Sequence, residues 1–148
     1  MPTKHLPARM ESLQEGMAFV TEQAQKKGFS EESISSVCLA VEEALVNVFN
    51  HAYAAGAGDV EVRVNASDGP LLTVEVRDSG IAFNPLSLPE PDVKADIAER
   101  KVGGLGVFLI RRMSDNLQYR RENDSNILTI TFSDHRGDAR VSDGGEQE

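Results

Sequence analysis

The sequence has almost none of the residues that disulfide-linked or zinc-dependent proteins rely on. One cysteine, Cys38, excludes an internal disulfide, and the three histidines, which are His5, His51 and His135, show no metal-ligand spacing. Cys38 falls on the apolar side of a predicted helix. We therefore expect it to be buried as a small hydrophobic side chain.

The sequence also lacks an excess of positive charge and any long apolar run. Lysine and arginine total 15 against 24 aspartate and glutamate residues, for a net charge of -9. This balance argues against a nucleic-acid-binding protein, which needs a basic surface, and favours partners with basic or mixed surfaces. No segment reaches the roughly 20 apolar residues of a membrane helix, and residues 1–6 lack the apolar core that is typical of a signal peptide. We expect a cytoplasmic protein.

The residues that are present fit one small globular domain. Hydrophobic residues make up 40% of the 148, and a chain of this length can bury a core. We expect an ordered domain over residues 1–133. The polar, glycine-rich segment 134–148 is predicted to be a disordered acidic tail.

Two helices are predicted in the first third of the chain. Residues 8–27 form the first, because apolar side chains recur at three- and four-residue steps and Gly28 follows as a stop. Ser30 is a good N-cap for the second helix, which is expected to reach about Ala54. The apolar positions of the first helix are Met10, Leu13, Met17, Val20 and Ala24.

Alternating hydrophobic residues predict two β-hairpins, one on each side of a third helix. The first hairpin spans 60–64 and 72–76, and the second spans 117–121 and 127–132. The proline-containing segment 84–102, with one helical turn near 95–100, is expected to be a mobile lid before a helix that begins at Gly104–Gly106. This order predicts an α+β fold, a two-layer α/β sandwich with an antiparallel-rich sheet and helices on one face.

The second helix carries a polar stripe of Glu43, Asn47 and Asn50 at helical spacing. Most such stripes are solvated surfaces. Here apolar residues flank the stripe, and no lysine or arginine occurs between Ser30 and Ala54, so a covered carboxylate lacks a cation. A bound Mg²⁺ would supply one, with Asn47 as a ligand and Glu43 as a general base one turn away.

Two further segments could contact a nucleotide. Asp78-Ser79-Gly80 follows a strand, where Asp78 could accept a hydrogen bond from an amino group and Gly80 could let a flat ring approach. The glycines at 103–106 open a helix, whose first N–H groups can bind phosphate. Each segment is a weak signal alone, since Asp-Ser-Gly is also an ordinary turn and the glycine run is not a P-loop.

Together the three segments resemble the nucleotide-binding boxes of the GHKL ATPase superfamily, which includes histidine-kinase catalytic domains, gyrase B and MutL. Residues 43–53 resemble its Asn-box, 78–80 its first glycine box and 104–106 its second, in family order. The resemblance implies the two-layer sandwich, Mg·ATP as ligand, Asn47 as magnesium ligand and Glu43 as catalytic base. The cofactor-binding residues that we expect on this basis are Asn47, Asn50, His51, Asp78, Gly80, Ala82, Phe83, Gly103, Gly104, Leu105, Gly106, Val107 and Thr129.

Within that superfamily the chain is most similar to the bacterial anti-sigma factor serine/threonine kinases, over about Leu6–Phe132. This resemblance implies phosphorylation of a small anti-sigma factor antagonist, sequestration of a sigma factor, and a homodimer. The chain departs from the family at Asn126–Thr129, where a Gly-Thr pair often precedes the last strand. Arg100 and Lys101 are candidates for a cation at the γ-phosphate, with a solvated lid position as the alternative.

Three functions remain open at this point. The first is a serine/threonine protein kinase, and the second is an ATP-gated regulatory binding protein without significant kinase activity. The third is a domain that binds no nucleotide. A two-component histidine kinase is disfavoured, because no histidine lies on a separate helical domain.

Overall fold

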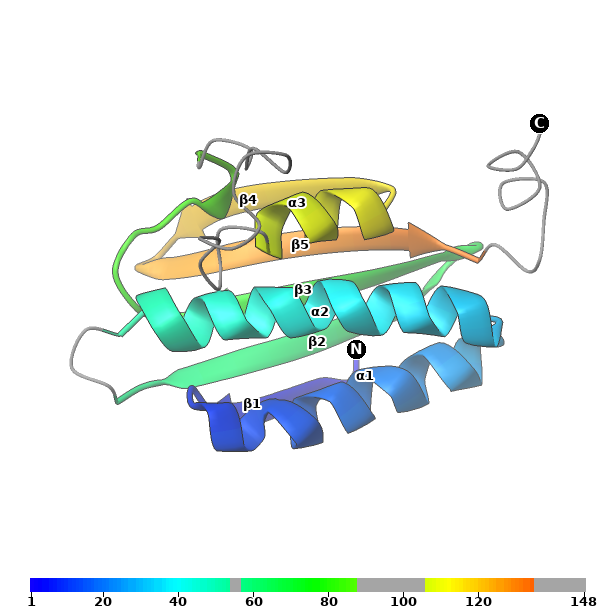
Figure 1. Ribbon diagram of the computed structural model, residues 1–148, viewed down its shortest axis with the longest axis horizontal. Helices are drawn as coiled ribbons and strands as arrows, with labels where there is room; N and C mark the ends of the chain where they lie inside the picture. Colours follow the sequence, from blue (N-terminus) through cyan, green and yellow to red (C-terminus); the bar gives the residue numbers. More distant parts are fainter. Residues whose placement is uncertain (54–56, 88–105, 135–148) are drawn as a thin grey trace, which may run out of the picture.

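The computed structural model describes residues 1–53, 57–87 and 106–134. They form two layers, with one five-stranded sheet behind and three α-helices packed on a single face of it (Figure 1). The strand order is β1-β2-β3-β5-β4, and every neighbouring pair is antiparallel. The predicted α+β sandwich, with an antiparallel sheet and helices on one face, is therefore confirmed.

The strands follow the predicted alternation of apolar and polar residues. In β3 every second side chain is buried, which places the apolar set against the helices and the polar set on the other face. Both predicted hairpins are present, and each strand is somewhat longer than the sequence pattern suggested. The strands are β1 (Thr3–Pro7), β2 (Asp59–Asp68), β3 (Leu71–Asp78), β4 (Asn116–Glu122) and β5 (Ser125–Ser133).

The helices are α1 (Leu13–Lys27), α2 (Glu31–His51) and α3 (Gly106–Met113), with short 3-10 turns η1 (Met10–Ser12) and η2 (Pro85–Ser87). The Ser30 hydroxyl accepts a hydrogen bond from the backbone N–H of Ser33, so the predicted N-cap of α2 is confirmed. Gly28 has a φ of 91° and ends α1 in the left-handed conformation that glycine adopts without strain.

Helix α2 lies at the centre of the helical layer and is covered on several sides. It contacts α1, α3 and strands β3 and β5. Residues on different faces of the helix are buried, including Leu45 toward the core and Val46 beside the polar stripe. The prediction that both sides of this helix are covered is therefore confirmed, and within the polar stripe Asn47 is buried whereas Asn50 is exposed.

The register of the sheet brings two polar residues to one end of the molecule. Asp78, the last residue of β3, is the direct partner of Asn126 near the start of β5. Both side chains are buried, at 6% exposure each. Because neighbouring strands place paired residues on the same face, both side chains point toward the helical layer.

The N-terminal part of the chain differs from the predictions. Strand β1 was not anticipated, and α1 begins five residues later than expected, after η1. Met10 is exposed and does not belong to the core, because it precedes the regular helix.

Two further expectations are corrected. Cys38 is only partly buried, and its Sγ lies 3.1 Å from the Thr21 hydroxyl. Asp134 was placed in a disordered tail, but its carboxylate accepts hydrogen bonds from the backbone and hydroxyl of Ser30. Residues 135–148, and the predicted lid from 88 onward, lie outside the described residues. Within the described ranges, none of the helices has the length and apolar character that a membrane span requires.

The turn between β4 and β5 allows a test of the fold. Asn123 and Asp124 have positive φ angles of 52° and 64°, the geometry in which Asn-Gly is the favoured pair. Asp124→Gly should raise the free energy of unfolding by about 0.5 kcal/mol, because it removes left-handed strain. Urea denaturation measures the change. The control Glu122→Gly, in the adjoining strand, should lower stability by about 0.5–1 kcal/mol, and equal effects at both sites would contradict the assigned turn.

Candidate functional site

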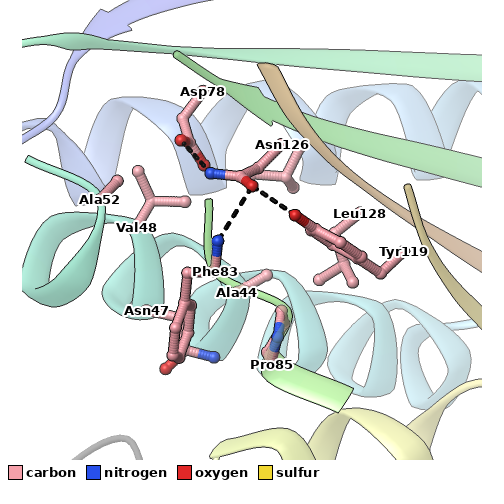
Figure 2. Close-up of a pocket in the computed structure, with 11 residues that line it drawn as sticks. Ala44, Asn47, Val48, Ala52, Asp78, Phe83, Pro85, Tyr119, Asn126 and Leu128 are labelled. Carbon is pink, nitrogen blue, oxygen red and sulfur yellow. Dashed lines mark hydrogen bonds between the residues drawn. The ribbon is translucent and has the colours of Figure 1, made fainter. Parts of the chain in front are cut away.

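A pocket lies between α2 and the ends of the central strands, and Figure 2 shows the side chains around it. The enclosed cavity is small in the ligand-free chain, about 30 Å³, and it is partly open to solvent. Most of the lining is apolar, with Asn47, Asp78 and Asn126 as polar members. The lining residues are Ala44, Asn47, Val48, Ala52, Val76, Asp78, Phe83, Pro85, Tyr119, Asn126 and Leu128.

Asn47 contributes a buried carboxamide to this pocket that no described residue satisfies. Its side chain is 5% exposed, and neither Oδ1 nor Nδ2 has a hydrogen-bond partner among the described residues. A buried polar group without a partner costs about 1–3 kcal/mol. An amide oxygen in this position fits a hard cation such as Mg²⁺, which often takes one or two protein ligands and fills its shell with phosphates and water.

Glu43 lies one helical turn before Asn47 and is half-buried. Burial raises the pKa of its carboxyl group, and the neighbouring Glu42 raises that pKa further. No described lysine or arginine forms an ion pair with Glu43. A carboxylate in such surroundings binds a proton more readily than a solvated one, which is what a general base requires.

Helix α3 begins directly against Glu43. A Cβ atom added to Gly106 would lie 2.8 Å from Glu43 Oε1, so glycine allows the start of α3 to approach the carboxylate. Val107 is buried beside it. The first described residues of α3 thus lie at the same end of α2 as the polar stripe, where the backbone N–H groups of a helix start can attract anions.

Asp78 lies across the pocket from the polar stripe and is held by two donors. Its Oδ1 accepts hydrogen bonds from the backbone N–H of Gly80 and from Asn126 Nδ2, each at 2.9 Å. No described residue donates to Oδ2. Asp78 is therefore fixed in orientation and retains one oxygen that can accept a hydrogen bond from a ligand.

The loop after β3 packs tightly on the end of α2. A Cβ atom at Gly80 would lie 2.0 Å from the backbone oxygen of Ala52, and the N–H of Ile81 donates to that same oxygen at 2.8 Å. We expected Gly80 to let a flat ring approach. The structure shows a different need for glycine here, which is close contact between the loop and the helix.

His51 and Phe83 connect the same loop to the last turn of α2. Their rings stack at a centroid distance of 5.0 Å with an interplanar angle of 27°. Phe83 lines the pocket, whereas His51 is exposed on the outer side of the pair. His51 thus supports a pocket wall and does not line the pocket itself.

The remaining predicted site residues are less well placed. Asn50 and Ala82 are exposed and do not line the pocket. Thr129 pairs with Glu75 and Gln118, so it lies on the opposite face of the sheet from Leu128 and the pocket. The structure therefore removes Thr129 from the candidate site. Gly103, Gly104 and Leu105, together with Arg100 and Lys101, lie outside the described residues.

Sequence reasoning missed Asn126 and Tyr119. Asn126 Oδ1 accepts hydrogen bonds from the Tyr119 hydroxyl at 2.5 Å and from the backbone N–H of Phe83 at 3.2 Å (Figure 2). The only available signal was an asparagine and a tyrosine in neighbouring predicted strands. Their meeting at Asp78 depends on the register of three strands, which the sequence pattern does not determine.

Comparison with known proteins gives a consistent family assignment. Residues 6–132 match the family model described as a histidine kinase-like ATPase domain. The chain is 33% identical over 133 residues to the serine-protein kinase RsbW of Listeria monocytogenes, covering 86% of this chain and 84% of that relative. It is 24% identical to the serine-protein kinase RsbW of Bacillus mycoides, over 74% of this chain and 70% of that one.

Solved structures share the fold. The RsbU and RsbW domains of a Mycobacterium tuberculosis protein match with a TM-score of 0.59 and 16% identity, over 90% of this chain and 32% of that one. A blue-light activated histidine kinase of Erythrobacter litoralis matches with a TM-score of 0.52 and 24% identity, over 71% of this chain and 31% of that one. At these identities the likeness concerns the fold alone.

The contact at Gly80 gives a testable prediction. Gly80→Ala should lower the free energy of unfolding by about 2 kcal/mol or more, because the added Cβ would overlap the backbone carbonyl of Ala52 in α2. Gly69→Ala is the control, since Gly69 has a φ of 58° and no atom within 4 Å of the added Cβ. That control should cost only about 1 kcal/mol of conformational strain. A smaller loss at Gly80 than at Gly69 in urea denaturation would show that the loop can leave α2.

Proposed function

The chain belongs to the histidine kinase-like ATPase domain family, and we propose that it transfers the γ-phosphate of Mg·ATP to a protein serine or threonine. Its sequence similarity to serine-protein kinases of this family supports the proposal. One observation carries this proposal. The unpartnered, buried carboxamide of Asn47 and the half-buried carboxylate of Glu43 lie one turn apart on α2, where no described cation offsets them.

Each part of the nucleotide is assigned to a part of the pocket in this proposal. The adenine ring would lie against the apolar walls, and Asp78 Oδ2 would accept a hydrogen bond from its amino group. Asn47 lies on the side of the pocket that continues toward Glu43 and Gly106, where the triphosphate would extend. Gly103, Gly104 and Leu105 are proposed phosphate contacts on the strength of the family resemblance.

The residues of α2 would then carry the chemistry. Asn47 Oδ1 would hold Mg²⁺ together with phosphate oxygens and water, and the metal would neutralise charge that develops on the transferred group. Among the described residues no cluster of three acidic, histidine or cysteine side chains competes for this ion. Glu43 would accept the proton of the substrate hydroxyl while the oxygen of that hydroxyl bonds to the γ-phosphorus and ADP leaves.

The proposed substrate is a small anti-sigma factor antagonist, and the proposed second partner is a sigma factor that the protein sequesters. Both follow from the resemblance to anti-sigma factor kinases, as do the homodimer and the cytoplasmic location. The net charge of -9 is consistent with partner proteins that offer basic surfaces. It gives no support to a direct contact with nucleic acid.

Removal of the base should separate chemistry from binding. Glu43→Gln should lower phosphoryl transfer to the antagonist at least about 100-fold, because the amide cannot accept the proton. ATP affinity should change little. Single-turnover transfer of labelled phosphate and calorimetric titration with Mg·ATP measure the two quantities.

The neighbouring Glu42→Gln is the matched control for this experiment. Glu42 lines a surface hollow with Met10 and Met17, away from the pocket. Its variant should keep transfer, with only the lower Glu43 pKa that follows from the loss of a neighbouring negative charge. Undiminished transfer in Glu43→Gln would contradict the assignment of the base. ATP binding without any transfer by the unmodified protein would favour the ATP-gated binding protein instead.

Loss of the proposed metal ligand should weaken ATP binding mainly when Mg²⁺ is present. Asn47→Ala should lower ATP affinity at least about tenfold in the presence of Mg²⁺ and much less in EDTA. Thermal shift against ATP concentration, with and without Mg²⁺, measures this difference. Asn50→Ala is the control, because Asn50 is exposed and outside the pocket, and equal losses in both variants would argue against Asn47 as a ligand.

A further inference from the structure

We propose that Asn126 is a positioning residue for nucleotide recognition, which holds Asp78 so that one carboxylate oxygen is kept for the amino group of adenine. The inference rests on the proposed function, since it concerns how the same pocket reads ATP. Asn126 does not touch the ligand in this proposal. It acts through the hydrogen bonds that it makes to Asp78 and to the loop after β3.

Every hydrogen-bonding position of the Asn126 carboxamide is in use. Nδ2 donates to Asp78 Oδ1 at 2.9 Å and to the backbone oxygen of Ile81 at 2.8 Å. Oδ1 accepts from Phe83 N–H and from the Tyr119 hydroxyl. A carboxamide offers two donors and two acceptor positions, so none remains for a nucleotide.

These partners also determine which way the amide faces. The carbonyl of Ile81 can only accept a hydrogen bond and the N–H of Phe83 can only donate one. A reversed amide would place oxygen against the Asp78 carboxylate and the Ile81 carbonyl, and nitrogen against the Phe83 N–H. The observed orientation is therefore the only one that satisfies the network.

The network selects the oxygen of Asp78 that can meet a ligand. Oδ1 already receives two donors, from Asn126 and from the backbone of Gly80, which fill its acceptor positions. No described residue donates to Oδ2. Without Asn126 only the Gly80 N–H would hold Oδ1, so the carboxylate could rotate more freely about its Cβ–Cγ bond and the acceptor for the adenine amino group would be less well fixed.

This role has a consequence that loss of stability alone would not produce. ATP presents an amino donor at position 6 of its ring, whereas inosine triphosphate presents an oxygen acceptor at the same place. A fixed Asp78 oxygen attracts the amino group of ATP and repels the oxygen at the same position of inosine triphosphate. The ratio of the affinities for ATP and inosine triphosphate therefore measures how well Asp78 is positioned. General loosening of the pocket would weaken both nucleotides by a similar factor.

The test measures the dissociation constants of ATP and inosine triphosphate for the full chain by calorimetry. The unmodified protein should prefer ATP, and Asn126→Ala should reduce that preference about tenfold, because one hydrogen bond to a charged group is lost. Thr131→Ala is the matched control. It removes a side chain from β5 on the opposite face of the sheet and should leave the preference unchanged.

Tyr119→Phe provides a second variant in case Asn126→Ala does not fold. It deletes only the hydroxyl that donates to Asn126 Oδ1 and keeps the ring that lines the pocket. The preference for ATP should fall about threefold, in the same direction as for Asn126→Ala. In the nucleotide-free protein, the side-chain amide signals of Asn126 should also shift in the NMR spectrum of this variant.

The possible outcomes separate the two proposals. Failure of the unmodified protein to bind ATP overturns the proposed function and this inference with it. If the protein binds ATP but folded Asn126→Ala keeps the preference for ATP over inosine triphosphate, the inference alone is overturned. If Asn126→Ala is unfolded, an unchanged preference in Tyr119→Phe overturns it in the same way. Equal weakening of both nucleotides also overturns it, because Asn126 would then only support the fold.

Discussion

The central constraint in this structure is the burial of the Asn47 carboxamide on a helix that is packed on several sides. α2 lies between α1 and α3 and against the sheet, and the Asn47 side chain is only 5% exposed. The amide nevertheless has no described partner, at a cost of about 1–3 kcal/mol. A bound ligand would offset this cost, and an oxygen-seeking cation, as in the proposed function, is one that an amide oxygen fits.

Glu43, one helical turn before Asn47 on α2, is a second polar group that is partly withdrawn from water. Its carboxyl group is half-buried beside Glu42, and both circumstances raise its pKa. α2 offers no lysine or arginine to offset this charge, although positive side chains are frequent elsewhere in the chain. Gly106 lets α3 approach the carboxylate closely, which further limits its contact with water. Asn47 and Glu43 thus form one end of the site, where polar groups are left for a ligand to complete.

The sequence predicted the elements whose signals are local and missed those that depend on pairing. α2 and the two hairpins were found, because helical spacing and strict alternation are properties of neighbouring residues. β1 was missed because it is five residues long, ends in Pro7 and has as its strand partner β2, which lies more than 50 residues away. Of the predicted polar stripe, Asn47 lines the pocket, whereas Asn50 is exposed. Asn126 was not predicted, since its meeting with Asp78 is fixed by strand register across 48 residues.

The two ends of the pocket differ in how far they are completed before a ligand arrives. At the Asp78 end, Asn126 uses all four of its hydrogen-bonding positions on protein groups, so Asp78 and the loop after β3 are held in place in the ligand-free protein. At the Asn47 end, the polar atoms have no described partner. Fixed donors and acceptors recognise a ring at little entropic cost, whereas unsatisfied groups gain most from a charged ligand. In the proposed function, the base would therefore meet groups that are already fixed by hydrogen bonds, and the phosphate and metal would satisfy groups that lack a described partner.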